Sequence, residues 1–187
     1  MKAANAPAEV LTLRPREARS ESRTASADAK PDAVAFAWED LGAILREVVP
    51  LARRHAYEVP RQETFEPDWE RYIQYQALGV MHVLTARSGG HLVGYVMLFV
   101  GPHIHYAHTQ WANISDPYLD PLYRSGWTGM RMLREAERRA KQLGAKFVDF
   151  AENTAYSNPS GRRLGVALKR LGYEPRDTIW TKRLGHA

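Results

Sequence analysis

The order of strand-like and helix-like segments predicts an α/β domain of the α+β type, with a mixed, mostly antiparallel sheet of six or seven strands and helices on both faces. Two stretches carry most of this prediction. Residues 81–87 and the apolar run 92–100 are strand-like segments that flank a turn containing Gly89 and Gly90, and such glycines supply the positive φ of a β-hairpin. In residues 116–143, an extended segment leads through a glycine-bearing turn into a long amphipathic helix.

Length and composition restrict the class of protein. The chain has 187 residues, of which 44% are hydrophobic, and it contains no cysteine. This suits one domain with an additional segment, and it excludes disulfides and thiolate chemistry. No run approaches the roughly 18 apolar residues of a membrane helix, and the N-terminus lacks the apolar stretch of a signal peptide. We therefore expect a cytoplasmic protein with no membrane partner.

The net charge of +5 would suit an acidic partner, such as the phosphates of a nucleotide or a nucleic acid. A solvated, arginine-rich surface explains the same charge more simply. No basic block with interleaved aromatic residues occurs, so nucleic-acid binding is not expected.

The N-terminal segment differs in composition from the rest of the chain. Residues 1–33 are rich in Ala, Glu, Arg, Ser and Pro and hold few large apolar side chains. Such a segment buries too little surface to offset the entropy of ordering. We predict an arm over residues 1–33 that is disordered alone or ordered by a protein partner, and a folded domain over residues 34–187.

The first half of the domain contains a strand over residues 34–38 and a helix that opens at Glu39 and Asp40. The buried stripe of this helix repeats at helical spacing and consists of Leu41, Ile44, Leu45, Val48 and Leu51 or Ala52. A second helix begins near Asp68. His55, Tyr57 and Glu58 at the end of the first helix face either solvent, which is the simpler interpretation, or a substrate pocket.

Histidines gather between the hairpin and the next strand, which we expect over residues 109–119. His103, His105 and His108 lie in a predicted connecting segment. A His-x-His pair without a third ligand nearby does not make a zinc site, so no metal site is predicted. The segment is either an ordinary polar loop or the source of a catalytic base.

The second half of the domain begins with a helix near Thr128 whose buried face holds Met130, Leu133, Ala136, Ala140 and Leu143. Gly144 caps its C-terminus. A buried strand over residues 146–151, a helix from Ser160 or Gly161 to Leu171, and a final strand over residues 179–184 complete the predicted order.

The turn before the helix at Thr128 has the features of an anion site. The first N–H groups of a helix have no internal partner, and the aligned peptide dipoles favour negative charge there. Arg124 adds a donor fork that suits phosphate. The alternative is an ordinary strand–turn–helix connection.

This stretch resembles motif A of the GCN5-related N-acetyltransferases (GNAT), whose usual form is Val-x-Pro-x-x-Arg-Gly-x-Gly-x-Gly/Ala. Leu119, Pro121, Arg124 and Gly129 match it without gaps, whereas Ser125, Gly126 and Trp127 depart from it. The hairpin and residues 167–174 are also similar to segments of that family, and the resemblance spans residues 34–184. The connection His103-Ile104-His105-Tyr106 further resembles acetyltransferase-like proteins of bacteriophage genomes.

The resemblance implies that acetyl-CoA is the donor substrate and that a small amine or a protein amine is the acceptor. It implies that the pantetheine arm lies between two strands that splay apart, and that the first two helices shape the acceptor pocket. The residues it assigns to acetyl-CoA are Tyr118, Leu119, Arg124, Ser125, Gly126, Trp127, Thr128, Gly129, Met130 and Asn153. Trp127 either obstructs the turn or points to solvent.

Acetyl transfer to an amine needs a base, donors for the thioester oxygen and an acid for the departing thiolate. The family often takes the base from a Glu on the strand before motif A and the acid from a Tyr on the last helix. This chain has no Glu on that strand, and Leu168 stands at the Tyr position, with Tyr156 as the nearest substitute. We predict His105 and Asp116 as proton acceptors, with Glu58 as a third candidate.

Two functional hypotheses of different classes follow. The first is an acyl-CoA-dependent N-acetyltransferase. The second is an inactive protein of the same fold that serves as a structural or interaction module, for example in a phage virion, and is anchored by its N-terminal arm.

Overall fold

The computed structural model describes residues 33–58, 64–151, 159–177 and 182. Residues 1–32 of the predicted arm, Asn153, Tyr156 and most of the predicted final strand lie outside this part of the chain. The elements are β1 (Ala35–Glu39), α1 (Leu41–Glu58), α2 (Trp69–Ala77), β2 (Met81–Ser88), β3 (His91–His103), β4 (Tyr106–Leu119), a 3-10 turn (Pro121–Tyr123), α3 (Thr128–Gln142), β5 (Ala145–Phe150) and α4 (Pro159–Arg170).

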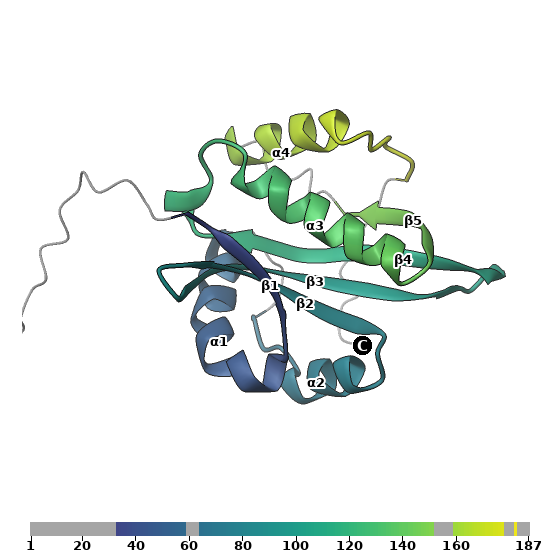
Figure 1. Ribbon diagram of the computed structural model, residues 1–187, viewed down its shortest axis with the longest axis horizontal. Helices are drawn as coiled ribbons and strands as arrows, with labels where there is room; N and C mark the ends of the chain where they lie inside the picture. Colours follow the sequence, from purple (N-terminus) through teal and green to yellow (C-terminus); the bar gives the residue numbers. More distant parts are fainter. Residues whose placement is uncertain (1–32, 59–63, 152–158, 178–181, 183–187) are drawn as a thin grey trace, which may run out of the picture. The chain divides into compact units, whose positions relative to one another are not determined.

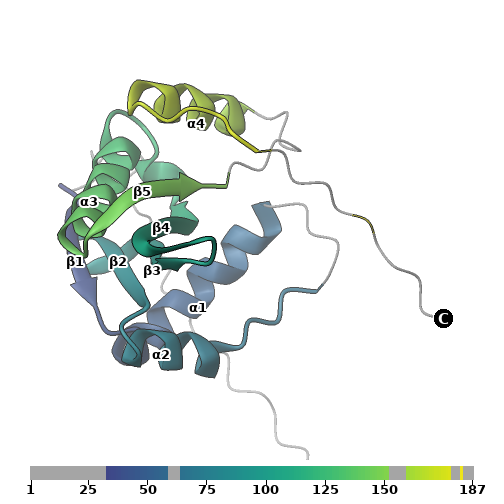
Figure 2. The same ribbon diagram turned by 90° about the vertical axis from the view of Figure 1, so that its right-hand side faces the viewer.

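The strands form one mixed sheet in the order β1-β2-β3-β4-β5. The first three pairings are antiparallel, and β4 pairs with β5 in parallel. Helices α3 and α4 cover one face and α1 and α2 the other (Figures 1 and 2). The predicted fold class is confirmed. The described residues hold five strands rather than six or seven, and the predicted strand at 179–184 falls outside them apart from Lys182.

Helix α1 buries most of the predicted stripe, because Leu41, Ile44, Val48, Leu51 and Ala52 are all buried, whereas Leu45 is only partly buried. They pack with residues of β2, β3 and β4 into the core on this face of the sheet. Asp40 caps the helix, since its Oδ1 accepts a hydrogen bond from the N–H of Ala43 at 2.9 Å. Within the described residues, no helix has both the length and the apolar character needed to cross a membrane.

Helix α3 begins at Thr128, as predicted, but its buried face is rotated from the predicted one. Met132 is buried together with Leu133, Ala136 and Ala140, whereas Met130 is only partly buried. At about 100° per residue, Met130 lies on the far side of Leu133 from the rest of this stripe. The prediction of Met130 as a core residue was therefore wrong.

The connecting segment predicted at residues 103–108 is mostly strand. β3 runs to His103 and β4 starts at Tyr106, and these two residues pair across the sheet. The rings of His103 and Trp111 lie 4.6 Å apart, and those of His103 and Tyr106 lie 4.9 Å apart. These tilted ring contacts lie at the end of the hairpin, where only residues 104 and 105 separate the two strands (Figure 2).

Strand β5 was predicted to be buried and is instead half open. It is an edge strand of the described sheet, and Phe147 is 49% exposed. Only its other face, with Val148 and Phe150, packs against the core under α3. The apolar residues Phe147, Val148 and Phe150 in this segment did not show whether the strand is buried on both faces or on a single face.

Candidate functional site

Strand β4 separates from β5 before it ends. Residues Gln110 to Ile114 pair with β5, and no β5 partner is found beyond Ile114 within the described chain. On its other side, β4 carries a bulge, because Ser115 and Tyr118 face Met97 and Tyr95, which are only two positions apart. The last residues of β4 therefore have no strand paired on one backbone edge among the described residues.

Asp116 lies in this bulge with φ of 48°. A positive φ is uncommon for a residue other than glycine, and strained backbone of this kind is concentrated at functional sites. The Asp116 carboxylate accepts a hydrogen bond from the Ser115 hydroxyl at 3.0 Å. The bulge thus fixes a carboxylate at the point where β4 leaves β5.

The N-terminus of α3 follows this strand and is open to an anion. Its N-cap residue, Trp127, makes no side-chain capping bond, and no acidic residue occupies the first turn. The first intrahelical bond runs from the N–H of Arg131 to the Trp127 carbonyl at 2.9 Å. The N–H groups of Thr128, Gly129 and Met130 consequently have no acceptor inside the helix, at the end where the dipole is positive.

The glycines of the turn keep this end accessible. Gly126 has φ of 70°, and a Cβ added at Gly129 would meet no atom within 4 Å. Trp127 is 62% exposed, so its indole is not packed into the turn. The residues predicted to bind acetyl-CoA between Tyr118 and Met130 thus surround one open helix end and the strand end before it.

Arg124 makes contacts that its sequence position did not suggest. Its Nε donates to the Leu119 carbonyl at 2.5 Å, and its Nη2 lies 2.7 Å from the Glu58 carboxylate. Arg54 forms a second ion pair with Asp120 at 3.0 Å. These two ion pairs join the last turns of α1 to the turn before α3. In this structure Arg124 holds the turn in place and does not stand ready as an isolated phosphate donor.

Two tyrosines and a histidine converge beneath these ion pairs. Tyr95 and Tyr118 face each other across β3 and β4, and each is 2% exposed. His55 Nδ1 lies 3.2 Å from the Tyr95 hydroxyl, and its ring lies 5.2 Å from that of Tyr118. Burial, with the nearby Glu58 and Asp120 carboxylates, raises the pKa of the Tyr118 hydroxyl.

The sequence offered only a weak signal for this cluster. His55 was one of several polar residues at a helix end, and its contact with Tyr95 joins residues 40 positions apart. Tyr57, which the sequence indicated as a candidate for the substrate pocket just as it did His55, is 91% exposed.

The two predicted proton acceptors are far apart. His105 lies in the turn between β3 and β4, and Asp116 lies near the other end of β4. At about 3.3 Å per strand residue, roughly 30 Å separates them. One site cannot hold both. Glu58, the third candidate, is paired with Arg124.

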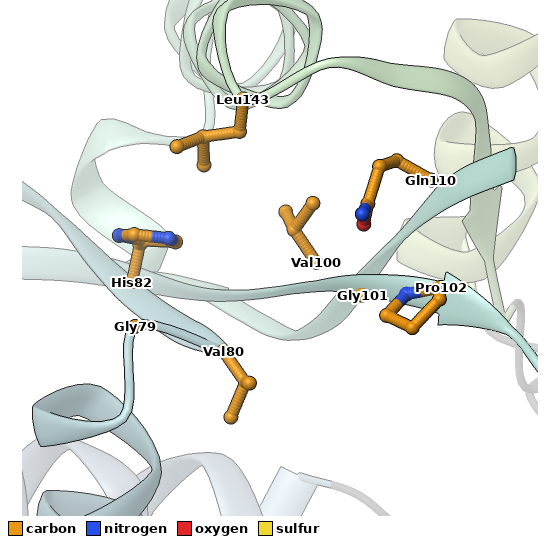
Figure 3. A pocket seen from close by; sticks show the side chains of 8 residues that line it. All are labelled: Gly79, Val80, His82, Val100, Gly101, Pro102, Gln110 and Leu143. Carbon is orange, nitrogen blue, oxygen red and sulfur yellow. The ribbon is translucent and has the colours of Figure 1, made fainter. Parts of the chain in front are cut away.

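A hollow of about 270 Å³ lies elsewhere on the molecule (Figure 3). It adjoins the C-terminal end of α3 and contains none of the predicted site residues. It is lined by Gly79, Val80, His82, Val100, Gly101, Pro102, Gln110 and Leu143. Burial lowers the pKa of His82. Within the described residues, no group of three or more His, Asp or Glu side chains could hold a metal ion.

Comparison with known proteins places the chain in a family. Residues 45–173 match the model of the acetyltransferase (GNAT) family. No curated protein matches the chain in sequence.

Several solved structures share the fold. A ribosomal-protein-alanine N-acetyltransferase from Brucella melitensis biovar Abortus 2308 is 17% identical with a TM-score of 0.63, and the match covers 81% of this chain and 99% of that chain. An aminoglycoside acetyltransferase from an uncultured soil metagenomic sample, in complex with sisomicin, is 14% identical with a TM-score of 0.64, covering 81% and 97% of the two chains. A predicted acetyltransferase with acetyl-CoA from Clostridium acetobutylicum is 15% identical with a TM-score of 0.62, covering 81% and 96%.

These likenesses show the fold alone. None of these three proteins bears on the resemblance to phage proteins, which stays a prediction. The family model, by contrast, covers more than half of the chain. From that match, and from the sheet and helix order that agree with it, we conclude that the chain belongs to the GNAT family of acetyltransferases.

Proposed function

We propose that the protein transfers an acetyl group from acetyl-CoA to an amine. The observation that carries this proposal is the uncapped N-terminus of α3, placed directly after the end of β4 that has left β5. A helix N-terminus of this kind binds phosphate oxygens through its free N–H groups and its dipole. Membership of an acetyltransferase family makes the pyrophosphate of acetyl-CoA the expected anion.

The residues present fit that ligand. The backbone from Ser125 to Met130 would hold the pyrophosphate, because Gly129 leaves open space and no carboxylate lies in the first turn. Asn153, which the resemblance also assigns to acetyl-CoA, lies outside the described residues. When bound, acetyl-CoA supplies the thioester that is attacked by the amine.

The edge of β4 that has no paired strand among the described residues would hold the pantetheine arm. The Asp120 N–H donates to the Val93 carbonyl at 2.8 Å, so it faces β3. Backbone groups alternate in direction along a strand, and the Leu119 N–H therefore faces the gap on the β5 side. Pro117 has no N–H to offer, so Leu119 is the nearest backbone donor on this edge.

Asp116 is the group that we propose as proton acceptor. An amine attacks only when it is neutral, and a positioned carboxylate can take its proton directly or through water. Asp116 lies at the bulge beside this edge of β4, whereas His105 lies at the other end of the strand. We therefore assign the role to Asp116 alone.

The acceptor is proposed only as a class, a small amine or a protein amine. The neighbours named above include enzymes of both kinds, so the fold does not choose between them. The alternative of an inactive structural protein in a phage particle has no support from the family or from the neighbours. The cytoplasmic location and the protein partner of the arm stay predictions.

The direct test is acetyl transfer by the purified full chain. CoA release would be followed with acetyl-CoA and a panel of amines that includes aminoglycosides and peptides with a free N-terminus. Asp116→Asn should lower kcat by about a hundredfold or more, the usual effect of losing a general base. The control is Asp68→Asn, because Asp68 is the N-cap of α2 and asparagine caps equally well.

The proposal would be contradicted if no amine of either class is acetylated. Its assignment of the base would be contradicted if Asp116→Asn keeps the kcat of the unmodified chain.

A further inference from the structure

The net positive charge of the chain is concentrated in the helices that cover one face of the sheet. Helices α3 and α4 contain nine lysine and arginine residues against two acidic ones, which gives them a net charge of +7. The whole chain has a net charge of only +5. Helices α1 and α2, on the opposite face, have the same combined length but contain four basic and three acidic residues. Figures 1 and 2 show α3 and α4 on one side of the sheet.

Four of these basic residues form a stripe along α3, termed here the α3 basic stripe. Its members are Arg131, Arg134, Arg138 and Lys141, and all four are exposed. At about 100° per residue, they fall within roughly 80° of one another, on the side of the helix opposite its buried residues. At about 1.5 Å per residue, the stripe is roughly 15 Å long and carries a positive charge about every 5 Å.

The charges of the stripe are only partly compensated within the domain. Arg138 is paired with Glu135 on the same helix. Arg134 and Lys141, by contrast, form no ion pair with any residue that the structure describes. Like charges three and four positions apart repel one another on a helix and destabilise it. A bound polyanion would remove this repulsion.

The composition of the stripe indicates the kind of anion. Three of its four members are arginine, whose planar fork of N–H donors matches the geometry of phosphate. No large apolar side chain of α3 is exposed, whereas a helix that lies on a membrane inserts an apolar face. The stripe also contains no aromatic side chain on which an unpaired base could stack. These features favour the phosphates of a duplex, whose bases are already stacked within it.

We propose that the α3 basic stripe binds the phosphate backbone of a nucleic-acid duplex without reading its sequence. A duplex carries one phosphate charge for about every 1.7 Å of its axis, so each cation of the stripe can reach a phosphate. Lys169 and Arg170 at the end of α4 are exposed and add positive charge on the same side of the sheet.

The sequence predicted no nucleic-acid partner, because its basic residues form no contiguous block. Helical spacing gathers residues three and four positions apart onto one surface, and this surface became visible only in the structure. The proposed binding uses the solvent-facing side of α3 and none of the N–H groups at its N-terminus. It is therefore independent of the proposed acetyl-CoA site.

The test measures binding of the full chain to short RNA and DNA duplexes of unrelated sequence by fluorescence anisotropy. Both kinds of duplex should bind, because the stripe contacts phosphate and no base edge. Four phosphate contacts predict that log K falls with log salt at a slope of about −3.6. Affinity should therefore fall by about a hundredfold between 50 and 200 mM salt.

Two double variants separate the stripe from the general charge of the protein. Arg134→Gln with Lys141→Gln removes two charges from the stripe, so the loss of affinity between 50 and 200 mM salt should shrink to about tenfold. Arg46→Gln with Arg53→Gln is the matched control, because it removes two exposed charges from α1 on the opposite face. The control should keep the hundredfold loss. Glutamine is a good helix former, so both variants should keep the Tm and the acetyl-CoA affinity of the unmodified chain.

The proposal is overturned if neither duplex binds, or if the control weakens binding as much as the stripe variant does. It is also overturned if vesicles containing phosphatidylserine, or a polyglutamate chain, bind more tightly than the duplexes. A chain that binds duplexes through the stripe and acetylates no amine would support this inference while contradicting the proposed function.

Discussion

Replacing Gly94 by alanine should destabilise the protein, because the new methyl group would collide with the backbone of β4. A Cβ built at Gly94 lies 2.6 Å from the Tyr118 carbonyl oxygen, 2.9 Å from Leu119 Cδ1 and 3.2 Å from Leu119 Cα. The first contact is with backbone and cannot be relieved by rotating a side chain. The end of β4 would have to move away from β3, and it carries Tyr118 and the proposed pantetheine edge.

The expected loss is about 1–3 kcal/mol, the usual range for inserting a methyl group into a well-packed site. For a domain of this size, each kcal/mol shifts Tm by about 2–4 °C, so Tm should fall by roughly 2–12 °C. Gly101→Ala is the matched control, because Gly101 lies on the same strand and a Cβ there meets no atom within 4 Å. It should be neutral or slightly stabilising.

Thermal unfolding followed by circular dichroism measures both variants, and titration with acetyl-CoA shows whether the displaced strand weakens binding. We expect Gly94→Ala to lose affinity and Gly101→Ala to keep it. If Gly94→Ala and Gly101→Ala have the same Tm, the close approach of β3 to the end of β4 is refuted, and with it the geometry of the proposed site.

Three further predictions concern other parts of the chain. Arg124→Ala removes the hydrogen bond to the Leu119 carbonyl and the ion pair with Glu58. It should lower the free energy of unfolding by about 1–3 kcal/mol and weaken acetyl-CoA binding. An unchanged Tm in thermal unfolding would contradict this prediction. Burial lowers the pKa of His82, so as pH falls below about 6.5 the unfolded chain binds a proton at this histidine before the folded chain does, and the free energy of unfolding decreases. His82→Gln should therefore make the free energy of unfolding, measured with urea, depend less on pH between 7.5 and 5.5. An equally steep pH dependence in the variant would refute this prediction. Deleting residues 1–33, which hold few large apolar side chains, should leave Tm nearly unchanged, whereas an unfolded product would show that the arm belongs to the core.

Much of the fold could be predicted from the sequence because it depends on local patterns. The apolar spacing of α1, the glycine turn at Gly89 and Gly90, and the helix start at Thr128 are each encoded within a few residues. The exceptions also have local causes. Met130 and Met132 stand on either side of the same stripe, and residue spacing alone did not show which side faces the sheet.

The open end of α3 could likewise be predicted, because helix geometry alone leaves its first N–H groups unpaired. The surroundings of the site could not. The ion pair between Glu58 and Arg124 joins residues 66 positions apart, and the facing of Tyr95 and Tyr118 depends on the register of two strands around a bulge. The sequence predicted a connecting segment around His105, which left its distance from Asp116 open. The structure instead places His105 at the tip of the hairpin between β3 and β4, far from Asp116.

Titration of acetyl-CoA into the full chain and into Gly129→Glu tests the central claim most directly. The unmodified chain should bind one acetyl-CoA saturably. A carboxylate at position 129 suits the positive end of α3, so the free variant should melt at the same temperature or higher. The same charge would lie against the pyrophosphate, and affinity should fall by roughly tenfold or more. Absence of binding by the unmodified chain, or equal affinity in the stably folded Gly129→Glu variant, would contradict an acetyl-CoA site at this helix end.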